Sequence, residues 1–193
     1  QVGGLAAVLE EGINGHMITL YNEGQHLPLL WTHLIPATLE GKALHNVQNA
    51  MAAALVAYAM DVSMENIRQG LRTFDTSYFQ APGRLNVYNE LPFKVILDYA
   101  HNPVAIQCMV DLATRMEAEG RQICVLSAPG DRRDEDVQDI ARIAAEGNFS
   151  HIIVRRDDHP RGRDLDEIPN LLRRGLVESG YPESQISVVP DEQ

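Results

Sequence analysis

Short apolar runs separated by a polar turn characterise the first thirty residues of the chain. The runs cover residues 5–9 and 16–21, and the stretch between them, residues 10–15, contains two glycines and an asparagine. Two strand-like runs joined in this way predict a β-hairpin. Helical patterns follow the hairpin, so we expect this part of the chain to be α+β.

Two helices are predicted between the hairpin and a turn-rich segment. Residues 45–60 are rich in alanine, and Ser63 can cap a second helix that carries Ile67, Leu71 and Phe74 at the spacing of one helix face. Residues 75–83 contain Ala81-Pro82-Gly83 and have the composition of a turn. We therefore expect a domain boundary near residue 80, with one part at residues 1–80 and another at residues 81–193.

The pattern after this boundary changes to strands that alternate with helices. A hairpin is expected at residues 85–88 and 93–97, and its second arm is the first of four compact apolar runs. The other three runs lie at 123–127, 151–154 and 186–189, and the helices are expected at 104–119, 134–146 and 166–179. Such alternation predicts a mostly parallel sheet with right-handed crossovers. The predicted fold class is α/β, with a Rossmann-like domain that follows the α+β part.

Composition and charge exclude several classes of protein. The 193 residues include 16 Lys and Arg against 27 Asp and Glu, so the net charge is −11. A dedicated nucleic-acid binder would be basic, and we expect no nucleic-acid partner. The longest apolar stretch, residues 50–60, is far shorter than the roughly 20 residues of a membrane span. We expect a cytoplasmic protein without a membrane partner, with Cys108 and Cys124 as reduced core residues.

Three polar loops follow the predicted strands of the second part. They cover residues 98–103, 128–136 and 155–163. Ligands bind beyond the carboxyl ends of the strands in a parallel α/β sheet, so these loops are candidate binding sites. An acid at a strand end, such as Asp98, suits a ribose hydroxyl, and arginine side chains suit carboxylates or phosphates. The alternative is that the loops are solvated surface segments of mixed charge.

A group of polar residues begins the alanine-rich helix. His45, Asn46 and Asn49 are spaced three and four apart, so they share one helix face. Their amides could contact an adenine edge, or they could cap the helix. The sequence holds no protein-only metal motif, no phosphate loop and no dinucleotide fingerprint, so we expect no metal ligands in this chain.

The ordered set of these motifs resembles the back half of the Mur ligase superfamily, whose members form amide bonds with ATP. The residues that carry the resemblance are His45-Asn46-x-x-Asn49, Ala81-Pro82-Gly83-Arg84 and Asp98-Tyr99-Ala100-His101-Asn102-Pro103. Within the superfamily, residues 130–136 and 157–163 look most like the Mur-ligase-like half of the cyanophycin synthetases, which polymerise aspartate and arginine. The resemblance implies the end of the central ATPase domain at residues 1–80 and most of the C-terminal Rossmann-like domain at residues 81–193.

The resemblance implies that one set of residues binds ATP. His45, Asn46 and Asn49 would lie near the adenine, Arg84 would reach the phosphates, Asp98 would bind the ribose, and His101 would line the nucleotide site. The family's phosphate loop, magnesium ligands and carbamylated lysine would all precede Gln1. We therefore expect a piece of a longer enzyme that uses ATP and Mg²⁺ and that is inactive alone.

The resemblance implies that the later loops bind the substrate. The family pattern Asp-Asn-Pro-Arg, which contacts the incoming amino acid, is matched by Asp158-His159-Pro160-Arg161, with a histidine in place of asparagine. Arg161 would hold the α-carboxylate, and Asp157 or Asp158 would pair with a cationic end such as a guanidinium. The expected substrate site also includes Asp131, Arg132, Arg133 and Arg163.

The implied reaction is an ATP-dependent ligation. A substrate carboxylate would attack the γ-phosphate of ATP, and the amine of the incoming amino acid would displace the resulting acyl phosphate. The expected partners are arginine and an aspartate-containing peptide or polymer, and exposed apolar surface would favour a homo-oligomer. The alternatives are a muramyl peptide ligase, a folylpolyglutamate synthase, a relative that joins preformed dipeptides, or a catalytically inert binding module.

Overall fold

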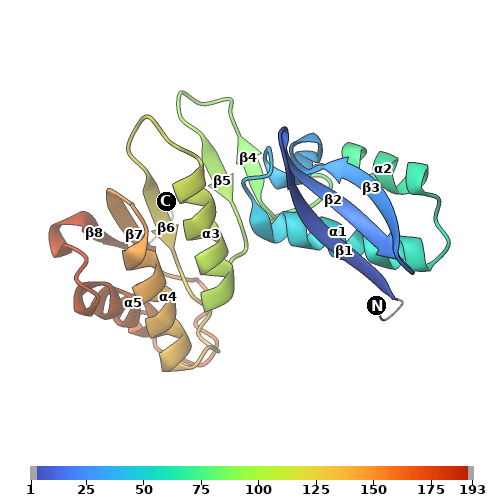
Figure 1. The fold of residues 1–193 in the computed structure, drawn as a ribbon. Helices are drawn as coiled ribbons and strands as arrows, with labels where there is room; N and C mark the ends of the chain where they lie inside the picture. The colour runs from blue at the N-terminus through green and yellow to red at the C-terminus, as the bar shows by residue number, and fades with distance from the viewer. Residues whose placement is uncertain (1–3, 191–193) are drawn as a thin grey trace. The chain divides into compact units, whose positions relative to one another are not determined.

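The computed structural model describes residues 4–190, whose contacts divide the chain into two compact units. The first unit is Gln1–Tyr99 and the second is Ala100–Gln193 (Figure 1). Residues 1–3 and 191–193, the chain ends, lie outside the described residues. The contacts group the hairpin after residue 83 with the preceding residues, and the domain boundary expected near residue 80 stays a prediction.

An antiparallel sheet of three strands begins the first unit. It is formed in the order β1 (Leu5–Gly12), β2 (Gly15–Asn22) and β3 (Gln25–Trp31). The hairpin of β1 and β2 confirms the sequence prediction, whereas β3 was not predicted as a strand. Pro28, which cannot donate to a ladder, interrupts the apolar run of β3 and lies next to a register shift between Ile18 and Thr19.

Helices α1 (Leu44–Ala59) and α2 (Met64–Thr73) follow the sheet and confirm both predicted helices. Two short 3-10 turns, Thr32–Leu34 and Pro36–Thr38, join β3 to α1. Ser63 caps α2, because its hydroxyl accepts a hydrogen bond from the Asn66 amide at 3.3 Å. The core of this unit is formed by the following buried residues of the sheet, the turns and the two helices: Ile18, Leu20, Leu29, Leu30, Ile35, Ala37, Val47, Ala50, Ala54 and Ile67.

The predicted hairpin after the turn-rich segment is present as β4 (Asn86–Tyr88) and β5 (Val95–Leu97), which pair antiparallel. Among the described residues, β5 pairs with β4 and not with the parallel sheet, so the apolar run at 93–97 belongs to the hairpin alone. The parallel sheet has three strands in the order β6 (Ile123–Leu126), β7 (His151–Arg155) and β8 (Ile186–Val189). An apolar run identifies a strand, but it does not identify the strand's partner.

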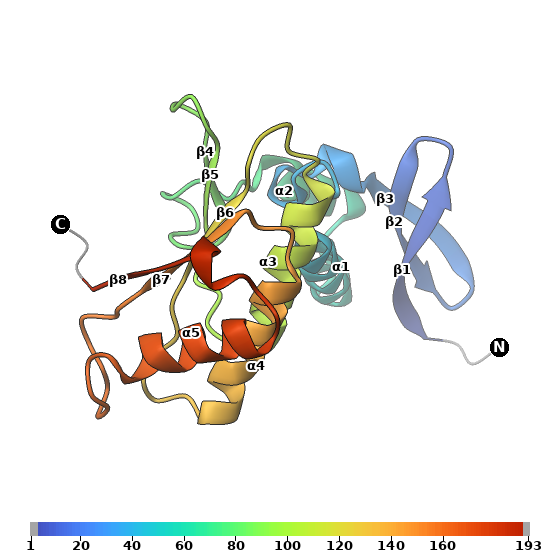
Figure 2. The same ribbon diagram turned by 90° about the vertical axis from the view of Figure 1, so that its left-hand side faces the viewer.

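Three helices complete the second unit: α3 (Pro103–Arg115), α4 (Asp134–Glu146) and α5 (Glu167–Glu178). Helix α3 stops before the predicted end at residue 119, and Glu117 has a left-handed φ of 47°. Helices α4 and α5 lie side by side on one side of the sheet (Figure 2). Their buried side chains pack on alternate residues of the strands, such as Leu126, Ile152 and Val154. The predicted α/β class with a parallel sheet is thereby confirmed.

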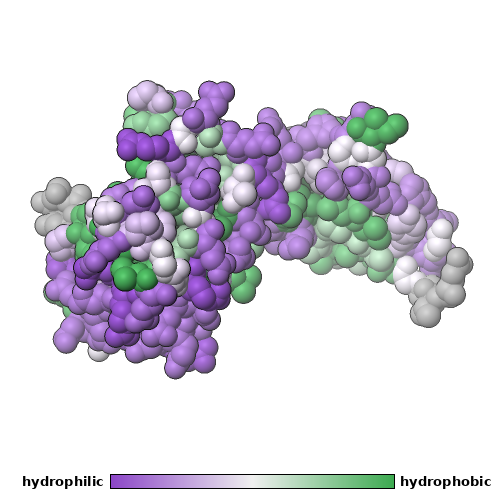
Figure 3. Space-filling view, turned by 60° about the vertical axis from the view of Figure 1, so that its left-hand side comes forward, coloured by the Kyte–Doolittle hydropathy of each residue, from purple (hydrophilic) through white to green (hydrophobic). Residues whose placement is uncertain are grey.

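Among the described residues, Cys108 and Cys124 form no disulfide, and both are partly buried. Cys124 packs against the core of the second unit, where burial raises the pKa of its thiol to about 12. Hydrophilic residues predominate in the surface view of Figure 3, with one continuous apolar area on the first unit and smaller apolar groups elsewhere. Within residues 4–190, no helix is long and apolar enough to cross a bilayer.

Candidate functional site

The first predicted site group lies at the start of α1. The Asn46 amide donates to the Ala37 carbonyl at 2.7 Å, and the Asn49 amide donates to the Asn46 side-chain oxygen at 3.2 Å. The N-cap position belongs to Ala43, which has no capping side chain, so the capping alternative is wrong for these residues. These two hydrogen bonds hold the Asn46 side chain in place. The Asn49 side chain, which donates to Asn46, is exposed to solvent.

His45 and Asp98 lie within electrostatic range of each other in the first unit. Burial lowers the pKa of the half-buried His45 imidazole, and the nearby Asp98 carboxylate opposes that shift. Asp98 also accepts a hydrogen bond from the Leu85 amide at 2.9 Å, which holds Leu85 at a left-handed φ of 51°. Two residues predicted for the nucleotide, one from the helix start and one from the end of β5, are therefore neighbours.

Arg84 lies next to the same carboxyl end of β5. Its guanidinium stacks over the Tyr99 ring, with 5.5 Å from the Arg84 Cζ atom to the ring centroid. Such stacking orients a guanidinium plane and leaves its edge available for anions.

Asn86 organises this corner, and sequence reasoning missed it. Its side chain is buried and makes three hydrogen bonds: its oxygen accepts from the Gly83 amide at 2.7 Å, and its amide donates to the Thr76 and Ala81 carbonyls at 2.7 and 2.9 Å. The segment that precedes Arg84 is thus attached to the first residue of β4. The signal in the sequence was weak, because one asparagine after a turn usually suggests only a turn.

The loops after β6 and β7 approach each other closely at the carboxyl ends of two adjacent parallel strands. A Cβ atom on Gly130 would lie 2.0 Å from the Pro160 carbonyl oxygen, so only glycine permits this approach. The two loops predicted as candidate sites are therefore brought together. Their contact also explains why Gly130 is buried in a polar segment.

Arg163 ties the second of these loops to the first. Its guanidinium donates to the Gly130 and Arg132 carbonyls at 2.7 and 2.6 Å, and it pairs with Asp134 and Glu167 at 2.7 and 2.6 Å. The two carboxylates, Asp134 first, raise the pKa of this guanidinium. Arg163, which the sequence predicts to bind substrate, thus makes these polar contacts within the protein and holds the loop after β7 in place.

An exposed ion pair spans the same two loops. Arg161 donates to the Asp131 carboxylate at 3.1 Å, and this bond lowers the pKa of Asp131. Arg161 itself has a left-handed φ of 51°. Asp131 and Arg161, predicted separately from two loops, are therefore neighbours.

Two buried polar atoms near the end of β6 lack a hydrogen-bond partner among the described residues. They are the Ser127 hydroxyl and the Arg132 Nε atom. Buried polar atoms are nearly always satisfied, and an unsatisfied one costs about 1–3 kcal/mol. Such atoms at a strand end are places where a ligand or a water molecule can supply the missing bond.

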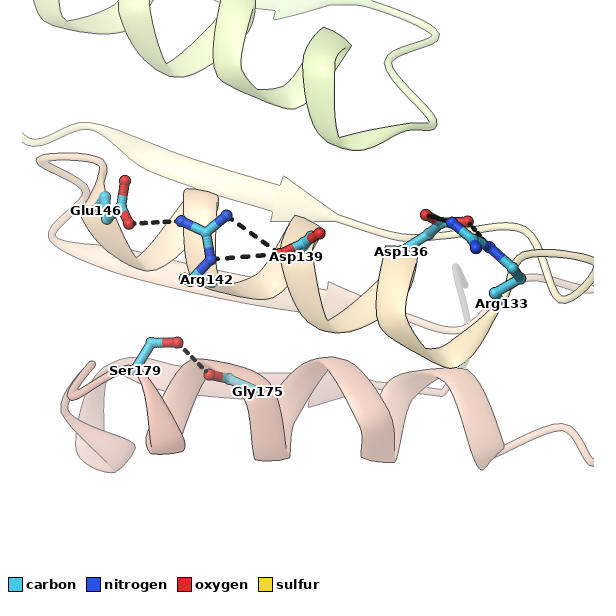
Figure 4. A network of polar contacts seen from close by, with 7 residues as sticks. All are labelled: Arg133, Asp136, Asp139, Arg142, Glu146, Gly175 and Ser179. Carbon is cyan, nitrogen blue, oxygen red and sulfur yellow. Dashed lines mark hydrogen bonds and ion pairs between the residues drawn. The ribbon is translucent and has the colours of Figure 1, made fainter.

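The remaining predicted residues lie beside this loop pair or at the start of a helix. Arg133 is turned to Asp136 along the first turn of α4, with two hydrogen bonds of 2.8 and 3.0 Å (Figure 4). Asp157 accepts from the His159 amide at 2.9 Å, and Asp158 is exposed. His101 immediately precedes Asn102, whose side chain caps α3 by accepting from the Ala105 amide at 2.9 Å.

A family model described as the Mur ligase, glutamate ligase domain matches residues 83–193. The chain belongs to the Mur ligase family. The match begins at the glycine that Asn86 binds and extends to the end of the chain, so it includes the two joined loops.

Curated relatives of this Mur ligase chain include cyanophycin synthetases. The enzyme of Nostoc sp. (strain PCC 7120) is 38% identical over 198 residues, which cover all of this chain and 20% of the relative. The enzyme of Crocosphaera subtropica is 39% identical over 175 residues, which cover 90% of this chain and 19% of the relative. A diaminopimelate ligase of Caldanaerobacter subterraneus is 29% identical over 146 residues, 75% of this chain and 29% of the relative. The chain thus spans about a fifth of the cyanophycin synthetases.

Solved structures share the fold of this Mur ligase chain. A crystal structure of MurF from Acinetobacter baumannii has a TM-score of 0.62 at 22% identity and covers 97% of this chain and 36% of that one. Folylpolyglutamate synthase of Mycobacterium tuberculosis, complexed with ADP and AMPPCP, has a TM-score of 0.62 at 21% identity and covers 95% of this chain and 37% of that one. At these sequence identities, the similarity shows that the fold is shared.

Proposed function

We propose that this chain is part of an ATP-dependent ligase of the cyanophycin synthetase type. In this proposal the enzyme joins arginine to the side-chain carboxylate of an aspartate in a peptide or polymer. The observation that carries the proposal is the joining of the loops after β6 and β7, which brings Asp131 and Arg161 together at 3.1 Å. The identity of 36–39% to cyanophycin synthetases over 90–100% of the chain supports this substrate class.

The joined loops have the chemistry to hold an amino acid with a cationic side chain. Arg161 can bind the α-carboxylate through a bidentate contact, with Asp131 as its partner in the absence of substrate. The exposed Asp158 offers a carboxylate to a guanidinium, which binds carboxylates in the same geometry. Ser127 and Arg132 hold buried polar atoms without a partner at the end of β6 and in the loop that follows it, whereas we assign Arg163 and Arg133 to positioning the loops.

We assign ATP to the corner formed by α1 and the end of β5. The Asn49 amide group can contact an adenine edge, and the Asp98 carboxylate, with two oxygens, can accept from ribose hydroxyls as well as from Leu85. Arg84 would neutralise phosphate charge, and we keep His45, Asn46 and His101 as neighbours of the nucleotide. A relative of the same fold was crystallised with ADP and AMPPCP. Within residues 4–190, no cluster of three His, Cys, Asp or Glu residues could hold a metal ion, and a Mg²⁺ site elsewhere stays a prediction.

The proposed chemistry needs orientation more than acid–base catalysis. An aspartate carboxylate oxygen attacks the γ-phosphorus of ATP and ADP leaves. The α-amine of arginine then attacks the acyl carbon, an amide forms, and inorganic phosphate leaves with its electron pair while the amine loses a proton. The residues of this chain would hold the α-carboxylate and the guanidinium so that the amine faces the acyl carbon. A cytoplasmic location, predicted from the sequence, stays a prediction.

The test is substrate-dependent ADP release by the full-length parent enzyme. It is given Mg²⁺, ATP and an aspartate-containing peptide primer, with arginine, lysine, aspartate or an aspartyl-arginine dipeptide supplied separately. We expect arginine to stimulate ADP release and to lengthen the primer by one arginine, as measured by mass spectrometry. Stimulation by the preformed dipeptide alone would favour a dipeptide-joining ligase, and no stimulation by any of them would favour a muramyl or folate-type ligase or an inert module.

A further inference from the structure

A cleft of the first unit lies apart from the residues assigned above. Its volume is about 600 Å³, and it is lined by the β1–β2 turn, the end of β3 and the segment that precedes α1. The lining residues are Asn14, Gly15, His16, Trp31, Thr32, His33, Glu40 and Gly41. None of them belongs to the predicted ATP or substrate residues.

One wall of the cleft is aromatic. The Trp31 and His33 rings lie at 23° to each other, with their centroids 6.3 Å apart. Trp31 is half-buried and His33 is exposed, so the wall reaches the solvent. Flat aromatic walls of this kind attract planar cations, which bind to the ring face.

The segment that precedes α1 contributes one carboxylate, Glu40, to the lining and has an unusual backbone conformation. Leu39, Glu40 and Gly41 are all left-handed, with φ of 49°, 60° and 84°. Gly41 cannot be replaced without a clash, because a Cβ atom would lie 2.7 Å from the Thr32 hydroxyl oxygen. This turn exposes the Glu40 carboxylate, whose ion pair with Lys42 spans 3.8 Å.

We propose that this cleft binds the guanidinium group of an arginine side chain. A guanidinium is planar, stacks on aromatic rings and pairs with carboxylates, whereas an ammonium lacks the plane and a neutral urea lacks the charge. The inference deepens the proposed function and rests on it for its biological meaning. The guanidinium would belong to an arginine already incorporated in the product chain, which the cleft would retain between additions.

The test is a fluorescence titration of the 193-residue chain, in which Trp31 is the one tryptophan. The probes are the N-acetyl amides of arginine, lysine and citrulline, and a peptide with several arginines. We expect the arginine amide to change Trp31 emission saturably, citrulline to have no effect, and lysine to bind about tenfold more weakly. The peptide should bind more tightly than the single amide because its arginines are linked.

Two variants with opposite expected effects on the binding of the arginine amide test the role of the Glu40 carboxylate. Glu40→Gln should weaken the binding of the arginine amide about tenfold, and Lys42→Ala should strengthen it, because Lys42 competes for the same carboxylate. Glu90→Gln, on the exposed β4–β5 turn, is the matched control and should change nothing. Circular dichroism verifies that each variant is folded.

The proposal is overturned if arginine produces no saturable change, if citrulline binds as well as arginine, or if folded Glu40→Gln binds normally. The titration contains neither ATP nor primer, so it can fail while the ADP-release test succeeds. The reverse outcome, arginine binding in the cleft of an enzyme that does not ligate arginine, would refute the proposed function and leave the cleft assignment intact.

Discussion

At the scale of single residues, a few side chains decide where the candidate site lies. Arg163 and Gly130 join the loops after β6 and β7, one through four polar contacts and the other through the absence of a side chain. Asn86 attaches the segment before Arg84 to the start of β4 through three hydrogen bonds. The contacts of Arg163 and Asn86 are short and polar, whereas that of Gly130 is a close steric approach, and all three involve backbone atoms that no spacing rule identifies in advance.

Replacing Gly130 by alanine should separate the two loops. The new Cβ atom would meet the Pro160 carbonyl oxygen at 2.0 Å, and we expect a loss of about 1–3 kcal/mol in the free energy of unfolding. Urea unfolding followed by circular dichroism measures it. Gly120→Ala is the control, because nothing lies within 4 Å of a Cβ atom there. Equal stability of Gly130→Ala and wild type would show that the loops do not touch as described.

Glu10 should make the stability of the first unit depend on pH. Its carboxylate accepts from the Thr19 and Tyr21 hydroxyls, both at 2.6 Å, and from His26, and these bonds, Thr19 first, lower its pKa from 4.5 to about 2. A lowered pKa in the folded state stabilises the fold above the unfolded value, and this contribution disappears as the pH falls from 4.5 toward 2.

The corresponding experiment compares the melting temperatures of wild type and Glu10→Gln over this pH range. We expect the variant to melt lower at neutral pH and the difference to shrink steadily below pH 4.5. Glu90→Gln, in an exposed turn, is the control. A difference that is constant with pH would contradict the assignment of the stabilisation to the ionised carboxylate.

At the scale of elements, sequence patterns were most informative where local rules act. Helix α4 occupies the predicted residues 134–146, because its apolar residues repeat with the helical period and all face one core. Strand β3 was missed because Pro28 interrupts its pattern. The pairing of β4 with β5 was predicted, but its separation from the three parallel strands depends on tertiary contacts that a short apolar run does not encode. The close approach of the two loops, which involves residues 30 apart such as Gly130 and Pro160, was likewise invisible.

Two substitutions in helix α2 should change the free energy of unfolding in opposite directions. Ser63→Ala removes the cap on the Asn66 amide and should lower the free energy of unfolding by about 1 kcal/mol. Gly70→Ala, at an exposed position inside the helix with nothing within 4 Å of a Cβ atom, should raise it by about 0.5–1 kcal/mol. Thermal unfolding measures both. Changes of the same sign in the two variants would contradict the view that α2 obeys helix rules independently of its packing.

At the scale of the whole molecule, the chain is two units with separate cores, and the family match extends over residues 83–193. The predicted nucleotide residues lie mainly in the first unit, whereas all the predicted substrate residues lie in the second. The sequence was sufficient for the family, since ordered motifs survive where spacing alone is ambiguous, and the two groups of site residues stay predictions. It was insufficient for the roles of Arg133 and Arg163, which the structure engages in intramolecular ion pairs.

The most direct test of the central claim is the kinetic effect of Arg161→Ala in the full-length parent enzyme. If the loops after β6 and β7 hold the incoming amino acid, the KM for arginine should rise by about tenfold or more while the KM for ATP changes less than about twofold. Asp61→Asn, on an exposed turn between the two helices of the first unit, serves as control. An unchanged KM for arginine, or an equal rise in both KM values, would contradict the assignment of these loops to the amino acid.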